Sequence, residues 1–420
     1  MSPLSSAGRR LWTPWFLLVA VTLLGPTALA GNSSTGDVAH DAGLQWGFDR
    51  IGTSDAWAVA RGEGVTIAVV DSGVDVDHED LAANIVSGVA CRDTGGDAAL
   101  CAGSPDDDDG HGTHVAGIAA AIDDNRTGIA GVAPDASILP VKVLFRACPD
   151  CGPTGSAPDV AAAVRWATDQ GADVINLSLG STTNSVFGPG FVDAIRYAWD
   201  RGAIPVVAAG NQLVLTADFG DAPAVVVSAV ARGDGIPSYA NGVGTARWAV
   251  TAPGGDSGDT AESCSQDGEP IGILSTYWSP EGNAAYACLS GTSMAAPHVA
   301  GMLALLLSAG LDPASAIETM LATTTDLGDP GPDATFGSGL VDASAALALA
   351  PSIGPASATT LPPDTGSLDG VEPGQPAETS APQPFVVDDD DDKPLAVVVL
   401  AIVGVLISGG ASIAARRRLA

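Results

Sequence analysis

Three residues of the types used in nucleophilic catalysis stand in short motifs that contain glycine. Asp71 opens Asp-Ser-Gly, His111 lies in Gly-His-Gly-Thr-His, and Ser293 lies in Gly-Thr-Ser-Met-Ala. A serine hydroxyl is a weak nucleophile, so it needs an imidazole to take its proton and a carboxylate to orient that imidazole. The three residues are therefore candidates for an acyl-transfer site.

An acyl-transfer site also needs hydrogen-bond donors for the oxyanion that forms on the substrate. Asn211 follows an apolar run at 204–208, and its side-chain amide is placed to supply one donor. We expect Ser293 to begin a long helix, and the first N–H groups of a helix have no partner within it. These donors would lie close to the reacting centre.

The elements that would position these residues alternate between strands and helices over 41–350. Continuous apolar runs, typical of strands buried on both faces, occur at 65–70, 172–177, 204–208 and 224–230. Helical patterns occur at 115–121, 157–170, 191–201 and 293–307. This order predicts an α/β fold with a mostly parallel sheet, whose ligand site lies beyond the carboxyl ends of the strands.

Four longer motifs carry a resemblance to a known family. They are Asp-Ser-Gly-Val from Asp71, His-Gly-Thr-His-Val-Ala-Gly from His111, Ala-Ala-Gly-Asn from Ala208 and Gly-Thr-Ser-Met-Ala-Ala-Pro-His from Gly291. In these motifs, and over about 41–350, the sequence resembles the subtilisin-like serine proteases, or subtilases, in which the catalytic order is Asp, His, Ser. The resemblance implies a subtilisin-like α/β fold with helices on both faces of the sheet.

The resemblance also implies a role for each candidate residue. Asp71 orients His111, His111 acts first as general base and then as general acid, and Ser293 is the nucleophile. Asn211 and the Ser293 N–H stabilise the oxyanion. The expected substrate is a protein or peptide. An esterase is the less favoured alternative, because the serine motif is not the G-x-S-x-G turn of those enzymes.

The family's substrate-binding segments fall on two short stretches of this sequence. These are Ser178, Leu179 and Gly180 on one side, and Ala208, Ala209 and Gly210 on the other. Their small, apolar character predicts a pocket that takes a large apolar side chain before the scissile bond.

The remaining polar motifs are interpreted as structural. His114 and His298 are expected to be packed helix residues. The acidic run 106–109 has the ligand type that calcium prefers, and many subtilases carry this ion, but such runs are more often solvated loops. We therefore predict that no cofactor is required, with calcium as an alternative structural ion.

Six cysteines lie in the part of the chain expected to be exported, which favours disulfides over a metal site. Six cysteines allow 15 pairings. The local pairing is our hypothesis, because each pair falls within one apparent loop: Cys91 with Cys101, Cys148 with Cys151, and Cys264 with Cys288.

The net charge is −32, from 49 acidic and 17 basic residues among 420. A nucleic-acid partner is disfavoured, because neutralising phosphates requires a basic face. The first interpretation is a solvated surface, and the second is adaptation to high salt.

The two ends indicate export and membrane anchoring. Residues 1–30 combine two arginines, an apolar run and Ala-Leu-Ala, as in a secretory signal peptide. Residues 395–415 are uncharged and precede a basic tail at 416–420, which predicts a transmembrane helix in a type I orientation. Residues 31–350 would then form the catalytic domain, outside a bacterial cell membrane.

A tether is predicted between the catalytic domain and the membrane helix. Residues 351–394 are rich in Pro, Ser, Thr and Asp, a composition that cannot bury enough apolar surface to become ordered. The sequence LPPDTG at 361–366 is similar to a cell-wall sorting signal but carries an extra residue, so it is interpreted as part of this linker.

The family's usual opening begins at Leu44, shortly after the predicted cleavage site, so no inhibitory prodomain is expected. The arrangement of signal, catalytic domain, proline-rich tether and anchor resembles the mycosins of type VII secretion. Two functions are therefore carried forward: a membrane-anchored endopeptidase of exported proteins, and a structural component of a secretion complex in which proteolysis is secondary.

Overall fold

The computed structural model describes residues 37–148, 152–179, 189–211, 219–256, 265–266, 269–280 and 285–353. Seven strands form one sheet in the order β2-β3-β1-β4-β5-β6-β7, and every neighbouring pair is parallel. The strands are β1 (Thr66–Asp71), β2 (Val89–Ala90), β3 (Ser137–Lys142), β4 (Val174–Leu177), β5 (Ile204–Ala208), β6 (Val225–Val230) and β7 (Trp248–Pro253).

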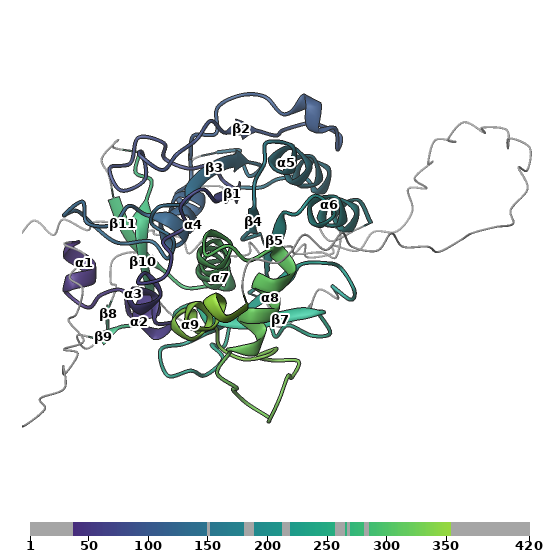
Figure 1. The fold of residues 1–420 in the computed structure, drawn as a ribbon. Coiled ribbons are helices and arrows are strands. Elements are labelled where there is room, and N and C mark those ends of the chain that lie inside the picture. Colours follow the sequence, from purple (N-terminus) through teal and green to yellow (C-terminus); the bar gives the residue numbers. More distant parts are fainter. Residues whose placement is uncertain are drawn as a thin grey trace, which may run out of the picture. The chain divides into compact units, whose positions relative to one another are not determined.

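The longer helices cover both faces of this sheet (Figure 1). They are α4 (His111–Ala120), α5 (Ala157–Asp169), α6 (Pro189–Trp199), α7 (Thr292–Ser308), α8 (Pro313–Ala322) and α9 (Ala343–Ile353). Shorter helices are α1 (Val38–Asp41), α2 (Trp46–Arg50), α3 (Thr53–Ala56) and the 3-10 helix η1 (Ala98–Leu100). The predicted α/β fold is therefore confirmed.

Alternation along the central strand separates two cores. Ile67 and Val69 of β1 point into a core shared with α4 and α7, whereas Ala68 and Val70 point into a core shared with α5 and α6. Successive side chains of a strand point to opposite faces, so an uninterrupted apolar run fills both cores. Asp71 is the last residue of this strand and lies at the carboxyl edge of the sheet.

A two-stranded antiparallel hairpin leads into the buried helix α7. It consists of β10 (Ile273–Tyr277) and β11 (Ala285–Leu289), and a further short pair is β8 (Ser265–Gln266) with β9 (Glu269–Pro270). Side chains of β10 also contact α4: the hydroxyls of Ser275 and Thr276 donate to carbonyls of that helix, each at 2.7 Å. The hairpin therefore connects α4 to α7.

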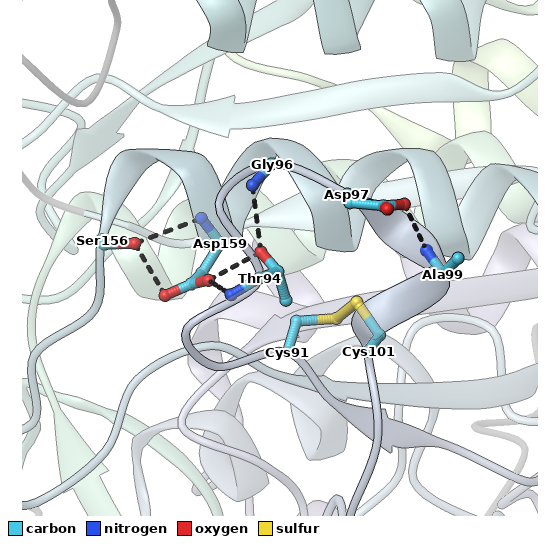
Figure 2. Close-up of a disulfide and its surroundings, with 8 residues drawn as sticks. All are labelled: Cys91, Thr94, Gly96, Asp97, Ala99, Cys101, Ser156 and Asp159. Carbon is cyan, nitrogen blue, oxygen red and sulfur yellow. Dashed lines mark hydrogen bonds between the residues drawn. A yellow bond between two sulfur atoms is a disulfide. The ribbon is translucent and has the colours of Figure 1, made fainter.

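A disulfide closes the loop that follows β2 and contains η1, as predicted. Cys91 and Cys101 are bonded, and the loop between them rests on the first turn of α5 (Figure 2). Thr94 donates to Asp159 Oδ1 from its N–H and from its hydroxyl, both at 2.7 Å, while Ser156 caps α5 by accepting from the Asp159 N–H. One carboxylate thus fastens the loop to the helix.

The other two predicted disulfides are described only in part. Cys148 and Cys288 are both disulfide-bonded, and no described cysteine is free. Their predicted partners, Cys151 and Cys264, lie outside the described residues. These two pairings stay predictions.

The predicted signal peptide (1–30), tether (351–394, of which only the end of α9 is described), transmembrane helix (395–415) and basic tail (416–420) fall outside the described residues. Within the described part, no single helix has the length and apolar character of a membrane span. Only α7 and α8 taken together pass that test, and these two helices meet at 120°.

Candidate active site

The carboxylate and the imidazole of the candidate triad are in direct contact. Asp71 ends β1 and is fully buried, and His111 is the first residue of α4. His111 Nδ1 lies 2.7 Å from Asp71 Oδ1, which also accepts the Ser72 N–H at 2.7 Å. Because an ionised carboxylate can only accept a hydrogen bond, Nδ1 carries the proton in this contact, and Nε2 is left as the basic nitrogen of a neutral imidazole.

The charges around His111 favour its protonated form. Burial alone would lower the pKa of His111, but the charge and the hydrogen bond of Asp71, together with the charges of Asp109 and Asp107, outweigh it and raise the pKa to about 9. The site is therefore built to stabilise a positive charge on this imidazole.

Two glycines allow the start of α4 to approach the turn that follows β1. A Cβ at Gly112 would lie 2.0 Å from the carbonyl oxygen of Gly73. Gly73 itself has φ +105°, a left-handed conformation that favours glycine, and a Cβ there would lie 2.5 Å from Pro105 O. The glycines of the two motifs thus keep Asp71 and His111 within hydrogen-bond distance.

The candidate nucleophile is tied to the end of β4. Ser178 Oγ donates to the Ser293 carbonyl at 2.8 Å, and Ser293 Oγ donates to the Ser178 carbonyl at 3.4 Å. Pro297 has no N–H for the Ser293 carbonyl four residues earlier in α7, so the Ser178 hydroxyl satisfies that acceptor instead. β4 pairs with β1, which places Ser293 at the same sheet edge as Asp71.

No hydrogen bond joins Ser293 Oγ to the His111 imidazole within the described residues. Catalytic contacts are often long in substrate-free proteins and shorten when substrate binds. The Ser293 hydroxyl makes one long hydrogen bond, to the Ser178 carbonyl at 3.4 Å. Because this bond is weak, turning the Ser293 side chain toward His111 costs little free energy.

The amide of Asn211 has a defined orientation. Its Oδ1 accepts from the Thr292 N–H at 2.9 Å and from the Thr292 hydroxyl at 2.8 Å. Its Nδ2 therefore points the other way, and a Cβ at Gly291 would lie 2.9 Å from that nitrogen. The arrangement presents an N–H donor beside the first turn of α7, where Ser293 stands.

Comparison with known proteins shows to which family the chain belongs. The family model for the subtilase family matches residues 62–339. The chain belongs to the subtilase family.

Relatives of this subtilase include bacterial proteases. The chain is 38% identical over 285 residues to thermitase of Thermoactinomyces vulgaris, covering 67% of this chain and 88% of thermitase. It is 40% identical over 290 residues to a thermophilic serine proteinase of Bacillus sp. strain AK1, covering 68% of this chain and 63% of that protein.

Two solved structures share the fold. A protease of Pseudoalteromonas arctica PAMC 21717 matches with a TM-score of 0.61 and 32% identity, covering 76% of this subtilase and all of that chain. Fervidolysin of Fervidobacterium pennivorans, a keratinolytic enzyme, matches with a TM-score of 0.59 and 29% identity, covering 75% of this subtilase and 46% of that chain.

The predicted substrate-binding residues follow two adjacent strands. Ser178 and Leu179 come directly after β4, and Ala209 and Gly210 come directly after Ala208, the last residue of β5. β4 and β5 are paired, so these segments leave the sheet side by side. Gly180 lies outside the described residues.

The two further histidines are packed, as predicted. His114 is fully buried in α4, and its Nε2 lies 3.0 Å from the carbonyls of both Ile273 and Ala287. His298 Nδ1 lies 2.8 Å from the Met294 carbonyl within α7. Burial is the main reason that the pKa falls to about 3 for His114 and about 4 for His298, so both are neutral.

The carboxylates of the acidic run 106–109 are bonded to other groups of the protein. Its carboxylates point to separate protein groups: Asp106 to Ser104, Asp108 to Lys142, and Asp109 to Arg146. Asp107 is buried among hydroxyl and backbone donors. Among the described residues no three His, Cys, Asp or Glu side chains are grouped to hold a metal. Calcium at this run stays a prediction.

Three residues support the site in roles that the sequence analysis did not predict. They are Thr292, which orients Asn211, Asp107, which contacts both motifs, and Lys142, which donates to the Ser72 carbonyl and to Asp108. Lys142 stands in register with Asp71 on β3, and its burial is unusual for a lysine. The position of Lys142 opposite Asp71 would have pointed to its role. That position is known only when the pairing of β1 with β3 is known.

Proposed function

We propose that this subtilase is a serine endopeptidase that acts through Asp71, His111 and Ser293. As Ser293 Oγ attacks the scissile carbonyl carbon, its proton passes to His111 Nε2, and Asp71 stabilises the resulting imidazolium. The C–N bond then breaks, the His111 proton passes to the leaving amine, and an acyl-enzyme remains. A water molecule, deprotonated by His111, releases the acyl group and restores the serine.

The oxyanion would be bound by the Asn211 side chain and by the N–H of Ser293. Asn211 supports this role because Thr292 fixes its amide with Nδ2 directed away from Oδ1. Donors held in place before the reaction need no reorganisation as charge develops on the substrate oxygen. No metal or cofactor takes part in these steps.

The single observation that carries the proposal is the 2.7 Å contact between His111 and Asp71, at the sheet edge where Ser293 stands. The test is hydrolysis of casein by the full chain, with Ser293→Ala and His111→Ala as matched variants. We expect each variant to lose more than about 10⁴-fold in kcat. A folded wild-type chain that cleaves no protein, or variants that cleave as well as wild type, would contradict the proposal.

We propose further that the residue before the scissile bond is a large apolar one. Leu179, Ala208 and Ala209 are buried at the ends of β4 and β5 and carry no charge. A library of fluorogenic peptides that vary at this one position should give its highest kcat/KM with Phe, Leu or Met. A preference for Lys or Arg would contradict this specificity.

The site of action that we propose is the outer face of a bacterial membrane, with 395–415 as the anchor. The support is the uncharged length of this segment and the arginines that follow it. Membrane fractionation of cells that express the full chain or a chain ending at 394 tests this, since only the full chain should sediment with membranes. Protease added to intact cells should digest the catalytic domain.

The second candidate is a mycosin-like structural role in a secretion complex. The order of signal, catalytic domain, proline-rich tether and anchor in the sequence favours it. The two functions separate in cells: a Ser293→Ala chain that sustains secretion when a deletion does not would favour the structural role. A Ser293→Ala chain that behaves like the deletion would favour proteolysis.

A further inference from the structure

Asp107 lies between the two motifs that supply the acid and the base, in the loop that precedes α4. Its side chain is buried, with the residue only 5% exposed. Oδ1 accepts from the Ser72 hydroxyl at 2.9 Å and from the Asp109 N–H at 3.0 Å. Oδ2 accepts from the Thr113 N–H at 3.0 Å and from the Thr113 hydroxyl at 2.6 Å.

These contacts connect the residue after Asp71 with the helix that begins at His111. Ser72 follows Asp71 directly, and its hydroxyl accepts the Gly112 N–H at 2.9 Å while it donates to Asp107. Thr113 stands two residues after His111 in α4, and its hydroxyl also accepts the Asp75 N–H at 2.9 Å. Asp107 therefore holds the acid-bearing turn and the base-bearing helix to each other.

The same contacts replace a missing helix cap. The N-cap position of α4 is Gly110, which has no side chain to accept the first N–H groups of the helix. The Ser72 hydroxyl and the Asp107 carboxylate accept the N–H groups of Gly112 and Thr113 instead. The first turn of α4, and with it His111, is thus fixed by groups outside the helix.

Asp107 differs from the two aspartates that follow it because it has no ion-pair partner among the described residues. Asp108 and Asp109 form ion pairs with Lys142 and Arg146, at 2.8 and 2.7 Å, whereas no ion pair involves Asp107 among the described residues. Burial raises the pKa of the Asp107 carboxyl, and its hydrogen bonds with Thr113, the Asp109 N–H and Ser72 oppose that rise. In its ionised form, the carboxylate acts on nearby charged groups through a medium that screens charge poorly. Its charge favours the protonated form of His111.

The other titratable or charged groups around His111 come from several elements. They are Asp71 on β1, Asp109 and its partner Arg146, Asp108 and its partner Lys142, His114 on α4, and Tyr277 on β10.

We propose that Asp107 is a positioning residue for the base, one that fixes His111 against Asp71 and adds a buried negative charge that stabilises the imidazolium. This inference rests on the proposed function. It assigns Asp107 no contact with substrate. Its two effects are separable, because one depends on hydrogen bonds and the other on charge.

The test compares Asp107→Asn with Thr113→Val in the full chain, with Asp106→Asn as the matched control. Asp106 is exposed, bonds to Ser104 and is adjacent in sequence, so the control removes an equal charge without touching the network. Each variant is assayed for kcat and KM between pH 5 and 11, and thermal melting confirms that it is folded.

For Asp107→Asn we expect kcat to fall by up to about 100-fold with little change in KM. Its acid limb of kcat/KM should move to lower pH by about one unit, because a negative charge near His111 is lost. Thr113→Val should lower kcat but leave the acid limb in place, because the charge remains. Asp106→Asn should behave as wild type.

The inference is overturned if folded Asp107→Asn keeps both kcat and the acid limb of an active wild type. If Asp107→Asn does not fold, Thr113→Val decides, and an unchanged kcat in that variant overturns the inference. A folded wild-type chain that is itself inactive would instead overturn the proposed function, and the inference with it.

Discussion

Asn211 Oδ1 accepts two hydrogen bonds from a single residue, Thr292, at 2.9 Å from the N–H and 2.8 Å from the hydroxyl. Thr292 precedes Ser293, so the residue that orients the oxyanion donor is covalently attached to the nucleophile. The hydroxyl of Thr292 also accepts the Gly210 N–H at 3.0 Å. These bonds identify Oδ1 as the accepting end of the Asn211 amide. The Nδ2 group is then the end that can donate to substrate.

Removing this donor should slow the chemical step rather than weaken binding. Asn211→Ala should lower kcat by about 10²–10³-fold with a small change in KM. Thr292→Val should lower kcat by about tenfold, because a loosened amide is a poorer donor. Thr292→Ser keeps the hydroxyl and serves as the control. Steady-state kinetics with one peptide substrate measure all three, and a loss confined to KM would refute this assignment.

The activity of the protein should rise with pH into the alkaline range. His111 must be neutral to accept a proton, and its pKa is raised to about 9, chiefly because the charge of Asp71 outweighs burial. The acid limb of kcat/KM should therefore fall near pH 9. Asp109→Asn should shift that limb to lower pH, because it removes one of the negative charges. If kcat/KM instead rises near pH 6.5 in both wild type and Asp109→Asn, the charges of the aspartates do not act on the His111 imidazole.

Ser178 should matter for both stability and rate. Ser178→Ala leaves the Ser293 carbonyl without a donor, because Pro297 cannot supply one, and should cost about 1–3 kcal/mol in free energy of unfolding. The Ser293 backbone would also lose its link to β4, so kcat should fall. Ser178→Thr keeps the hydroxyl as the control. Urea unfolding and kinetics check the two effects, and an unchanged unfolding midpoint would contradict the first.

Acid should destabilise the fold through the buried neutral histidines. For His298, with a pKa lowered to about 4 by burial, the unfolded chain takes up a proton below about pH 6.5 while the folded chain does not. Its contribution is fully present above about pH 6.5 and is lost as the pH falls toward 4, by up to about 1.4 kcal/mol per pH unit.

The matched variant isolates this contribution. In His298→Gln the free energy of unfolding, measured by urea at pH 7, 6 and 5, should depend on pH less steeply than in wild type. Other groups titrate in both proteins and cancel in the difference. Equal pH dependence in the two proteins would show that His298 is not held neutral.

The Cys91–Cys101 disulfide should stabilise the fold without being required for catalysis. The double variant Cys91→Ala/Cys101→Ala should lose about 2–3 kcal/mol in free energy of unfolding, because the unfolded loop is no longer closed. The loop stays fastened to α5 through Thr94 and Asp159. Thermal melting under non-reducing conditions tests this, and a melting temperature equal to that of wild type would contradict it.

Much of the fold could be predicted from local patterns. The strand at 204–208 matches β5, and the other predicted strands begin or end within two residues of β1, β4 and β6. The strands β2, β3 and β7 were not predicted. β3 contains Pro140, and a proline inside a strand argues against a central position. Successive backbone nitrogens of a strand point alternately to its two neighbours. The Ser137 N–H points toward β1, so the nitrogen of Pro140, three residues later, points toward β2. There β2 pairs only with Val141 and Lys142, and no hydrogen bond is lost.

The candidate site could be predicted as residue types but not as a network. Asp71, His111 and Ser293 were found because their motifs are local in sequence. The contacts that orient them join distant residues: Ser72 to Asp107, Ser178 to Ser293, and Thr292 to Asn211 are 35, 115 and 81 residues apart. Only the strand order brings such residues together, so their roles required the structure.

The central claim is that Asp71, His111 and Ser293 form a working nucleophilic site. The most direct test treats the full chain with a serine-directed fluorophosphonate probe and maps the adduct by peptide mass spectrometry, with Ser293→Ala and Asp106→Asn as variants. We predict an adduct on Ser293 in wild type and in Asp106→Asn, and no labelling in Ser293→Ala. A folded wild-type chain that stays unlabelled, or labelling that persists in Ser293→Ala, would contradict the claim.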